Sequence, residues 1–530
     1  MNRIPLATAV CMAFLLSACG SRADFTVLGN GSGNGNGNGA GSGDSAGSTG
    51  TASLSQQQAG ASAGPGTSLG TGSTAGGPAT GVGGTGGGSG TGGGSGTGGG
   101  SGSGAGTSST GGTGTSGHPG GGLAPIRLAY IIQQTAGVSA LTGSNVSSSN
   151  DTNTIDMNAL VNYANAHGGV GGRKIQATGV PLQATSQQSD RLTTCKSITE
   201  DLKAQVVLDE NEYLSEDGWS CFAQHKVNYY GTVTATDRQY LRSTSPYVTT
   251  TWLALDRTMK ALVAGGRQAN FFAGQQVGVL LADVPTSHRL FDAILKPALA
   301  AAGVGNPQVR YISNDSSGGS QQAQTNSAEL AFATAGVTRI LFLHNILVYL
   351  AFTNQAQSQG YHPQYAFSDY QGMTGVAAFY GSSAQNANAL AVSSSASFVP
   401  DDASKKSTDT TAKYDRNKMT PGQQRCLDLM SKQTGKDYYD PNSSGDTLAN
   451  WVYYCDEFFL WWESAQAIGA SWTPDQTGRG MATLGTSYLS TLQHSIDFSG
   501  GVNDGASSFR VGRYNTTCSC FPKISGWQPI

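Results

Sequence analysis

Short apolar runs alternate with amphipathic stretches from Leu123 to the end of the chain. The first series contains four runs that predict buried strands, at 126–132, 174–182, 204–210 and 227–233. Between the first two runs, residues 155–166 place apolar side chains at helical spacing. A second series repeats the rhythm, with predicted strands at 275–283, 309–313, 339–345 and 363–369. Strands that alternate with helices form parallel sheets, so two such series predict an α/β fold with two lobes.

The segment GGVGGRKI (168–175) contains four glycines followed by two cations, a composition that often binds phosphate. A phosphate-binding loop, however, follows a strand and opens a helix, where backbone amides face the anion. Here the glycines follow a predicted helix and precede a predicted strand. We therefore expect a turn in which Gly168 or Gly169 is left-handed, with Arg173 and Lys174 starting a strand at the surface.

The first 18 residues are typical of a signal peptide, with Arg3, an apolar run from Ile4 to Leu16 and small residues at the exit. The ending Leu-Ser-Ala-Cys resembles the bacterial lipobox, in which the cysteine is acylated. We expect Cys19 to carry a lipid that anchors the protein to a membrane without spanning it. The alternative is an ordinary secretory signal in which Cys19 has no special role.

Residues 19–122 consist almost entirely of Gly, Ser, Thr, Ala and Asn. Such a segment buries too little apolar surface to offset its ordering entropy, so we expect a disordered tether. A flexible coil of this length has a root-mean-square reach of roughly 50–60 Å. The pattern GDSAG at 43–47 matches a hydrolase motif, but that motif requires a strand-to-helix turn that the tether lacks.

The net charge and the cysteines indicate which partners and which covalent links to expect. The formal net charge of −3 argues against a surface for nucleic acid, which needs a basic stripe. Six cysteines follow Cys19, and an even number in an exported protein indicates disulfides. We expect the pairs Cys195–Cys221, Cys426–Cys455 and Cys518–Cys520. Zinc is the alternative, but no C-x-x-C or closely spaced histidine supports it, and we expect neither a metal nor a cofactor.

The order of helix, GGVGGRKI and strand, followed by a cysteine-bearing helix and VVLDE (206–210), resembles the type 1 periplasmic binding proteins. The segments at 277–304, 361–372 and 495–515 resemble the branch that binds leucine, isoleucine and valine. The resemblance covers 123–530 and implies two Rossmann-like lobes, joined by three crossings near 246–252, 390–400 and 494–500. Lobe 1 would be about 123–249 plus 396–495, and lobe 2 about 250–395 plus 496–530. It also implies a ligand in the cleft between the lobes and an ABC permease as partner.

Ligands of open parallel sheets bind at the carboxyl ends of the strands, so the residues just past each predicted strand are candidates. By resemblance, Thr234 and Thr236 donate to a ligand carboxylate, although threonines here also suit a helix cap. Asp369 lies where the family places an acid against the ligand's ammonium group; the alternative is an exposed strand-end aspartate. The further candidates are Gln134, Thr135, Ser215, His344 and Tyr370.

The turn after the third strand departs from the family. It contains Glu210, Glu212, Glu216 and Asp217, where a small Gly/Ser turn is usual. So many carboxylates disfavour an anionic ligand and favour a more polar or cationic compound, an amide or an aromatic one.

The sequence has no H-E-x-x-H motif and no P-loop ending in G-K-[ST], so we expect binding without catalysis. Asp456 and Glu457 do not form an acid pair, since neighbours on a helix face apart. We expect one of them to be buried and the other solvated. The sequence thus favours a solute-binding lipoprotein of an ABC importer, with a sensing or surface-interaction lipoprotein of the same fold as the alternative.

Overall fold

The protein is described from a computed structural model. The described residues are 22–26, 123–134, 145–183, 186–209, 214–231, 236–314, 318–374, 377, 383–395, 397–401, 413–440, 443, 448–501 and 503–530. The predicted signal peptide, Cys19 and most of the predicted tether lie outside these residues. Among the described residues, no helix combines the length and the apolar character needed to cross a bilayer.

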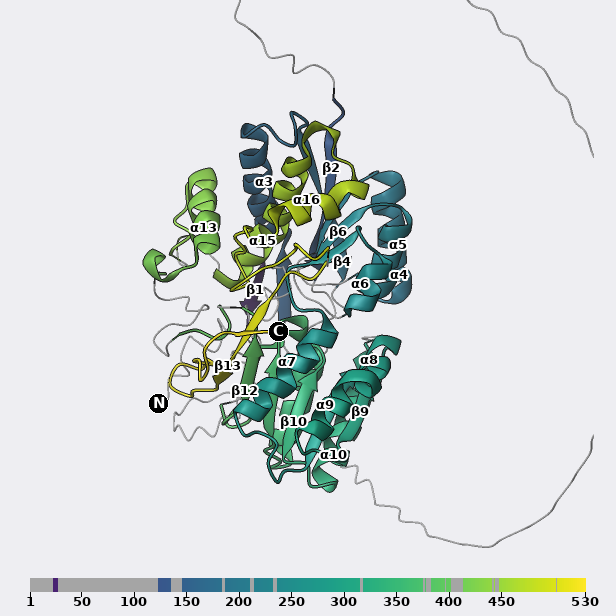
Figure 1. The fold of residues 1–530 in the computed structure, drawn as a ribbon, viewed down its shortest axis with the longest axis vertical. Helices are drawn as coiled ribbons and strands as arrows, with labels where there is room; N and C mark the ends of the chain where they lie inside the picture. Colours follow the sequence, from purple (N-terminus) through teal and green to yellow (C-terminus); the bar gives the residue numbers. More distant parts are fainter. Residues whose placement is uncertain are drawn as a thin grey trace, which may run out of the picture. The chain divides into compact units, whose positions relative to one another are not determined.

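The first lobe is built on a five-stranded parallel sheet (Figure 1). In spatial order its strands are β4 (Ile175–Gln183), β2 (Ile126–Gln134), β5 (Val206–Asp209), β6 (Asn228–Gly231) and β7 (Val248–Thr250). Its early helices are α3 (Asn150–Ala166), α4 (Gln188–Lys196), which continues into a π-helical turn at Ser197–Asp201, α5 (Ser215–Gln224) and α6 (Arg238–Ser243). Three later helices join the same lobe, α13 (Pro421–Thr434), α15 (Leu448–Ile468) and α16 (Thr477–Leu484).

The second lobe is built on a seven-stranded sheet (Figure 1). Its spatial order is β14 (Gln528–Pro529), β13 (Ser508–Arg513), β12 (Leu390–Ser393), β11 (Gln364–Ser368), β10 (Arg339–Leu343), β8 (Val277–Ala282) and β9 (Gln308–Ile312). Its helices include α7 (Leu255–Gln268), α8 (Pro285–Leu290), a π-helical turn at Phe291–Leu295, α9 (Lys296–Ala301), α10 (Gly318–Thr334) and α11 (Ile346–Ser358). Strands β8 to β12 are parallel, whereas β13 and β14 are antiparallel additions that the sequence pattern did not predict.

Alternate residues of each central strand face opposite layers of helices. In β2, Leu128 and Tyr130 join the cluster that contains α3 and α15, while Ala129 and Ile131 join the one formed with α4 and α5. Successive side chains of a strand point to opposite faces, so a strand covered on both sides reads as one apolar run. This explains why continuous apolar runs located four strands of each sheet, whereas the short strands β7 and β12 were not predicted.

The chain passes between the lobes three times. It crosses between β7 and α7, between β12 and α13, and between α16 and β13. The predicted two-lobed α/β fold with three crossings is therefore confirmed, and the residue limits that we assigned to the lobes remain a prediction.

One short part of the expected tether is ordered into a strand. Strand β1 (Arg22–Thr26) pairs antiparallel with β3 (Asn145–Ser149). The expectation of a disordered tether over 19–122 remains a prediction. The sequence RADFT contains no glycine, unlike the rest of the tether, so its backbone loses less entropy on ordering.

The glycine-rich segment is a turn, as expected, because it lies between α3 and β4. Gly168 and Gly169 both have positive φ, +92° and +61°. A Cβ on Gly169 would stand 1.9 Å from the carbonyl oxygen of Arg173, so this tight turn excludes any side chain there.

Arg173 was expected merely to start a surface strand, and this is wrong. Its guanidinium is half-buried and donates to the carbonyl oxygens of Ala124 at 3.0 Å and Trp472 at 3.0 Å. These hydrogen bonds link the residues just before β2 to the segment after α15.

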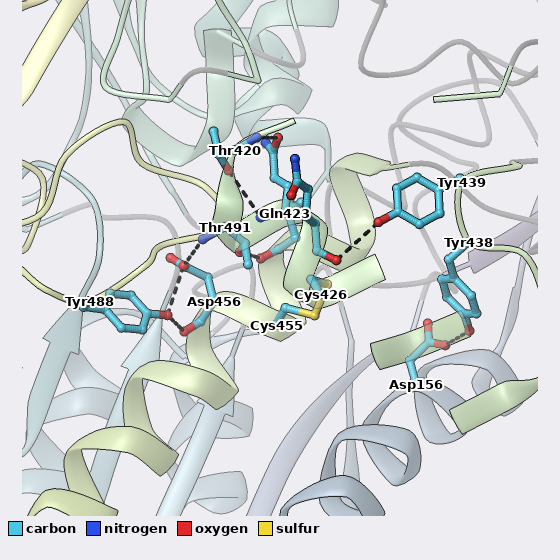
Figure 2. The surroundings of a disulfide bond; sticks show 12 residues. Asp156, Thr420, Gln423, Cys426, Tyr438, Tyr439, Cys455, Asp456, Tyr488 and Thr491 are labelled. Atoms are coloured by element: carbon cyan, nitrogen blue, oxygen red, sulfur yellow. Dashed lines mark hydrogen bonds between the residues drawn. A yellow bond between two sulfur atoms is a disulfide. The ribbon is translucent and has the colours of Figure 1, made fainter. Parts of the chain in front are cut away.

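All three expected disulfides are present, Cys195–Cys221, Cys426–Cys455 and Cys518–Cys520. Figure 2 shows the second of them, which joins α13 to α15. Both of its cysteines are completely buried. The bridge therefore attaches α13 to the core of the first lobe.

Helix α15 buries both acids that we expected to differ in exposure. Asp456 is 0% and Glu457 2% exposed, so the prediction of one solvated acid is wrong. Asp456 accepts hydrogen bonds from Tyr488, Ser490 and the backbone of Thr491, as Figure 2 shows in part. The run WVYYCDEFFLWWES is apolar on nearly all sides, which is the pattern of a fully buried helix and could have predicted this.

Candidate functional site

Polar side chains gather where strands of both sheets end. In the first lobe, β5 leads into α5 and β6 leads into α6; in the second, β8 leads into α8. Side chains from the first turns of these helices contact one another across the two lobes. This is the edge of a parallel sheet where ligands bind.

Glu216, in the first turn of α5, connects the lobes directly. Its Oε1 accepts a hydrogen bond from the hydroxyl of Thr236, in its own lobe, and another at 2.9 Å from the hydroxyl of Thr286 in α8 of the second lobe. Burial raises the pKa of Glu216, although the two hydroxyls and the more distant Arg289 oppose the shift. Within the part of the chain that the structure describes, no ion pair is formed by this carboxylate.

A second connection between the lobes is an ion pair. Arg289 of α8 donates to Asp237, the N-cap of α6, at 2.8 Å. Asp237 is buried, whereas Arg289 is 40% exposed at its side chain. The hydrogen bond to Asp237 holds the pKa of Arg289 above its ordinary value, so the guanidinium stays charged.

Asp217 follows Glu216 but belongs to a different network within the first lobe. Arg191 of α4 donates to both of its oxygens, at 3.1 Å to Oδ1 and 2.9 Å to Oδ2. Ser215 also donates to Asp217. Ser215 was a candidate ligand donor, and in this structure its hydroxyl is already engaged.

Asp504 forms a third connection at the crossings. It is fully buried and accepts from Arg238 of α6 at 3.0 Å and from Arg257 of α7 at 2.8 Å. The backbone amide of Ala254 donates to it at 3.2 Å. Two arginines, one from each lobe, therefore share one carboxylate.

Asp369, directly after β11, is buried and not the exposed strand-end residue of the alternative interpretation. Its Oδ2 accepts from the backbone and hydroxyl of Ser394, at 2.6 and 2.9 Å, where β12 ends. Its Oδ1 makes no hydrogen bond of ordinary geometry, although the hydroxyls of Ser393 and Thr374 lie near enough to affect the titration. Burial raises the pKa of Asp369 to about 6.

Two other candidates of the second lobe have structural contacts. His344 is fully buried, with Nε2 2.8 Å from the carbonyl oxygen of Ile312 and Nδ1 accepting from the amide of Asn345. Burial lowers the pKa of His344 to about 4, so the ring is neutral at pH 7. The side chain of Tyr370 lies in the core formed with α7.

The remaining candidates are less informative. Gln134 is half-buried at the carboxyl end of β2. Thr135 and Thr234 lie outside the described residues. Thr236 is described, and its hydroxyl donates to Glu216, which the sequence analysis had not paired with it.

Sequence reasoning missed the partners of these side chains. Arg289 and Asp504 were not considered, and Glu216 was noted only as part of an acidic turn. Position just after a strand is the signal that could have found Thr286; no sequence signal relates Asp504 to Arg238, 266 residues away. Among the described residues, no group of three or more His, Cys, Asp or Glu side chains is placed to hold a metal ion.

Comparison with known proteins identifies the fold through solved structures and not through sequence similarity. No protein-family profile matches the sequence, and no curated protein is similar to it in sequence. Solved structures are similar over about three quarters of the chain. A fatty acid ABC transporter substrate-binding protein from Thermomonospora curvata has a TM-score of 0.53 and 14% identity, covering 77% of this chain and 92% of its own.

Two further solved structures give the same result. A possible leucine/isoleucine/valine-binding protein from Rhodopirellula baltica SH 1 has a TM-score of 0.53 and 9% identity, covering 76% of this chain and 96% of its own. A solute-binding protein of an ABC transporter from R. palustris, in complex with 4-hydroxybenzoate, has a TM-score of 0.51 and 14% identity, covering 77% and 96%. The chain therefore has the type 1 periplasmic binding protein fold.

Proposed function

We propose that this protein is an extracytoplasmic solute-binding protein that captures a small molecule, an amino acid or a related compound, between its two lobes for an ABC-type importer. It performs no chemistry on the molecule that it binds. One observation supports the proposal most directly: in a type 1 periplasmic binding fold, polar side chains at the carboxyl ends of both sheets meet across the lobes, as Glu216 and Thr286 do.

The mechanism follows from differential affinity. A molecule that contacts both lobes only when they are close together shifts the population toward the closed arrangement. The three crossings would act as the hinge, and Asp504, held by one arginine from each lobe, would keep the crossings in register as the lobes move. A permease would then recognise the closed form.

The test is a thermal-shift screen of the purified full-length protein against amino acids, amines, amides and aromatic acids. A ligand should raise the melting temperature by an amount that grows with its concentration. Small-angle scattering with each compound that shifts the melting temperature should show compaction on binding. A complete panel without a stabilising compound would count against solute binding.

We also propose that Cys19 carries the lipid anchor, because Leu-Ser-Ala-Cys ends the signal-like segment. In cells fed labelled palmitate, the native protein should incorporate label and sediment with membranes. The variant Cys19→Ser should lose both properties. Label retained in the variant would show that acylation occurs elsewhere.

A further inference from the structure

The contacts of Glu216 indicate which class of ligand the site accepts. One carboxylate receives hydroxyl donors from both lobes, Thr236 and Thr286. Both threonines are buried, at 1% and 6% exposure. A ligand carboxylate that sought the same hydroxyls would have to displace Glu216 and remain beside its charge.

Glu216 differs from the other acids around it, because those acids have cationic partners. Asp217 is paired with Arg191, and Asp237 is paired with Arg289. Among the described residues Glu216 has no such pair, and the same holds for Asp369 on the second lobe. The region thus contains two acids, one from each lobe, that form no ion pair with any described side chain.

Asp369 adds an independent observation. It is 4% exposed, and its Oδ1 is a buried acceptor without a hydrogen bond. Leaving a buried charged acceptor unsatisfied costs free energy, so a donor that arrives with a ligand would be favoured. Beside Thr286, the hydroxyl of Ser287 is likewise buried and unpartnered.

The sheet topology sets the spacing of the two strand ends that lead to Thr286 and to Asp369. Thr286, which binds Glu216, follows β8, and Asp369 follows β11; only β10 lies between these strands. Neighbouring strands lie about 4.8 Å apart, so the two strand ends are separated by about 10 Å. An elongated amine of five or six carbons is of suitable length.

We propose that Glu216 is a specificity-determining residue and that the site binds an organic ammonium ion that lacks a carboxylate. An ammonium group takes the charge of Glu216, and in a diamine the second ammonium takes that of Asp369, while Glu216 itself occupies the hydroxyls that a ligand carboxylate would use. This inference rests on the proposed function, because it presupposes binding between the lobes.

Cadaverine and lysine form a matched pair for the test, since they differ only in the carboxylate. Isothermal titration of the full-length protein should show cadaverine binding at least about 10- to 100-fold more tightly than lysine, the range expected for one charge-assisted contact. The pair isopentylamine and leucine should show the same preference. Native protein that prefers lysine or leucine would overturn the proposal.

The variants assign the preference to Glu216. Glu216→Ala frees the two hydroxyls, so lysine should bind more tightly and cadaverine more weakly, which reverses their ratio. Glu216→Gln keeps the hydrogen bonds without the charge, so cadaverine should weaken and lysine should not improve. Asp217→Asn, at the neighbouring acid, should leave the ratio as in the native protein.

Two outcomes separate this inference from the proposed function. If neither amine binds but another class in the thermal-shift panel does, solute binding stands and the amine specificity is wrong. If no compound binds at all, both are wrong. An unchanged ratio in Glu216→Ala, with the fold verified by circular dichroism, would show that Glu216 does not set specificity.

Discussion

Asp504 and Glu216 both connect the lobes of this protein, and their surroundings are opposite. Asp504 is fully buried between Arg238 and Arg257, one cation from each lobe. Glu216 also reaches both lobes, but its partners are the neutral hydroxyls of Thr236 and Thr286. The first carboxylate is compensated within the protein, and the second is not.

The difference separates a permanent connection from an exchangeable one. Removing one partner of a buried ion pair leaves an uncompensated charge, so the group around Asp504 stays together whatever the ligand state. A carboxylate held only by hydroxyls keeps its negative charge available to a cation that arrives with a ligand. We therefore assign Asp504 to the hinge and Glu216 to the ligand.

The largest loss of stability is expected when Asp504, the permanent connection between the lobes, is removed. Asp504→Ala leaves Arg257, whose side chain is 8% exposed, buried and unpaired. We expect a loss of about 3–5 kcal/mol in the free energy of unfolding, measured by urea denaturation. As a control, Asp428→Ala breaks an exposed pair with Arg416 and should cost about 1 kcal/mol or less. Equal losses of stability in the two variants would show that the ion pairs of Asp504 contribute no more than an exposed pair.

A second prediction concerns Asp369, which resembles Glu216 in lacking a cation. Its pKa is raised from 3.8 to about 6 by burial, so the folded state favours its protonated form. The stability that this group contributes is present below pH 4 and is lost as the pH rises through about 6. Asp369→Asn, a neutral mimic, should therefore be up to about 3 kcal/mol more stable than the native protein at pH 7 to 8.

The advantage of Asp369→Asn should disappear near pH 4, where the native acid is also protonated. Melting temperatures of both proteins between pH 4 and pH 8 would measure this convergence. A difference that is constant with pH would mean that Asp369 is not buried as an uncompensated acid.

The smallest effect is expected at Glu216. Glu216→Ala loses hydrogen bonds to two hydroxyls but also removes a half-buried charge without an ion pair, and these contributions oppose each other. We expect the free energy of unfolding to change by no more than about 1 kcal/mol without ligand. A loss as large as that of Asp504→Ala would show that Glu216 is a structural connection, and the comparison would fail.

Much of the fold could be predicted because its strands are buried on both faces. Strand β8, Val277–Ala282, is apolar throughout and was located within two residues at its start and one at its end. The strands β13 and β14 escaped prediction, since Gln528–Pro529 carries no strand pattern and pairs only because β13 offers a free edge.

The candidate site was predicted in position but not in its contacts. Strand ends pointed to Thr236 and Asp369, and both are buried near the places where the lobes or strands meet. The contact between Glu216 and Thr286 could not be predicted, because the two residues are 70 positions apart and belong to different lobes.

The sequence by itself determined the two α/β lobes and the glycine turn, because these depend on local spacing and on the alternation of apolar and polar residues. The even number of cysteines indicated disulfides, but the fold decides which of them pair, as it does for Cys426 and Cys455. Only the tertiary structure decided which acids are neutralised. Charge compensation depends on distances between side chains that the fold brings together, as Asp504 shows with Arg238 and Arg257. The same composition could have paired Glu216 with an arginine, and the fold places the hydroxyls of Thr236 and Thr286 against it instead.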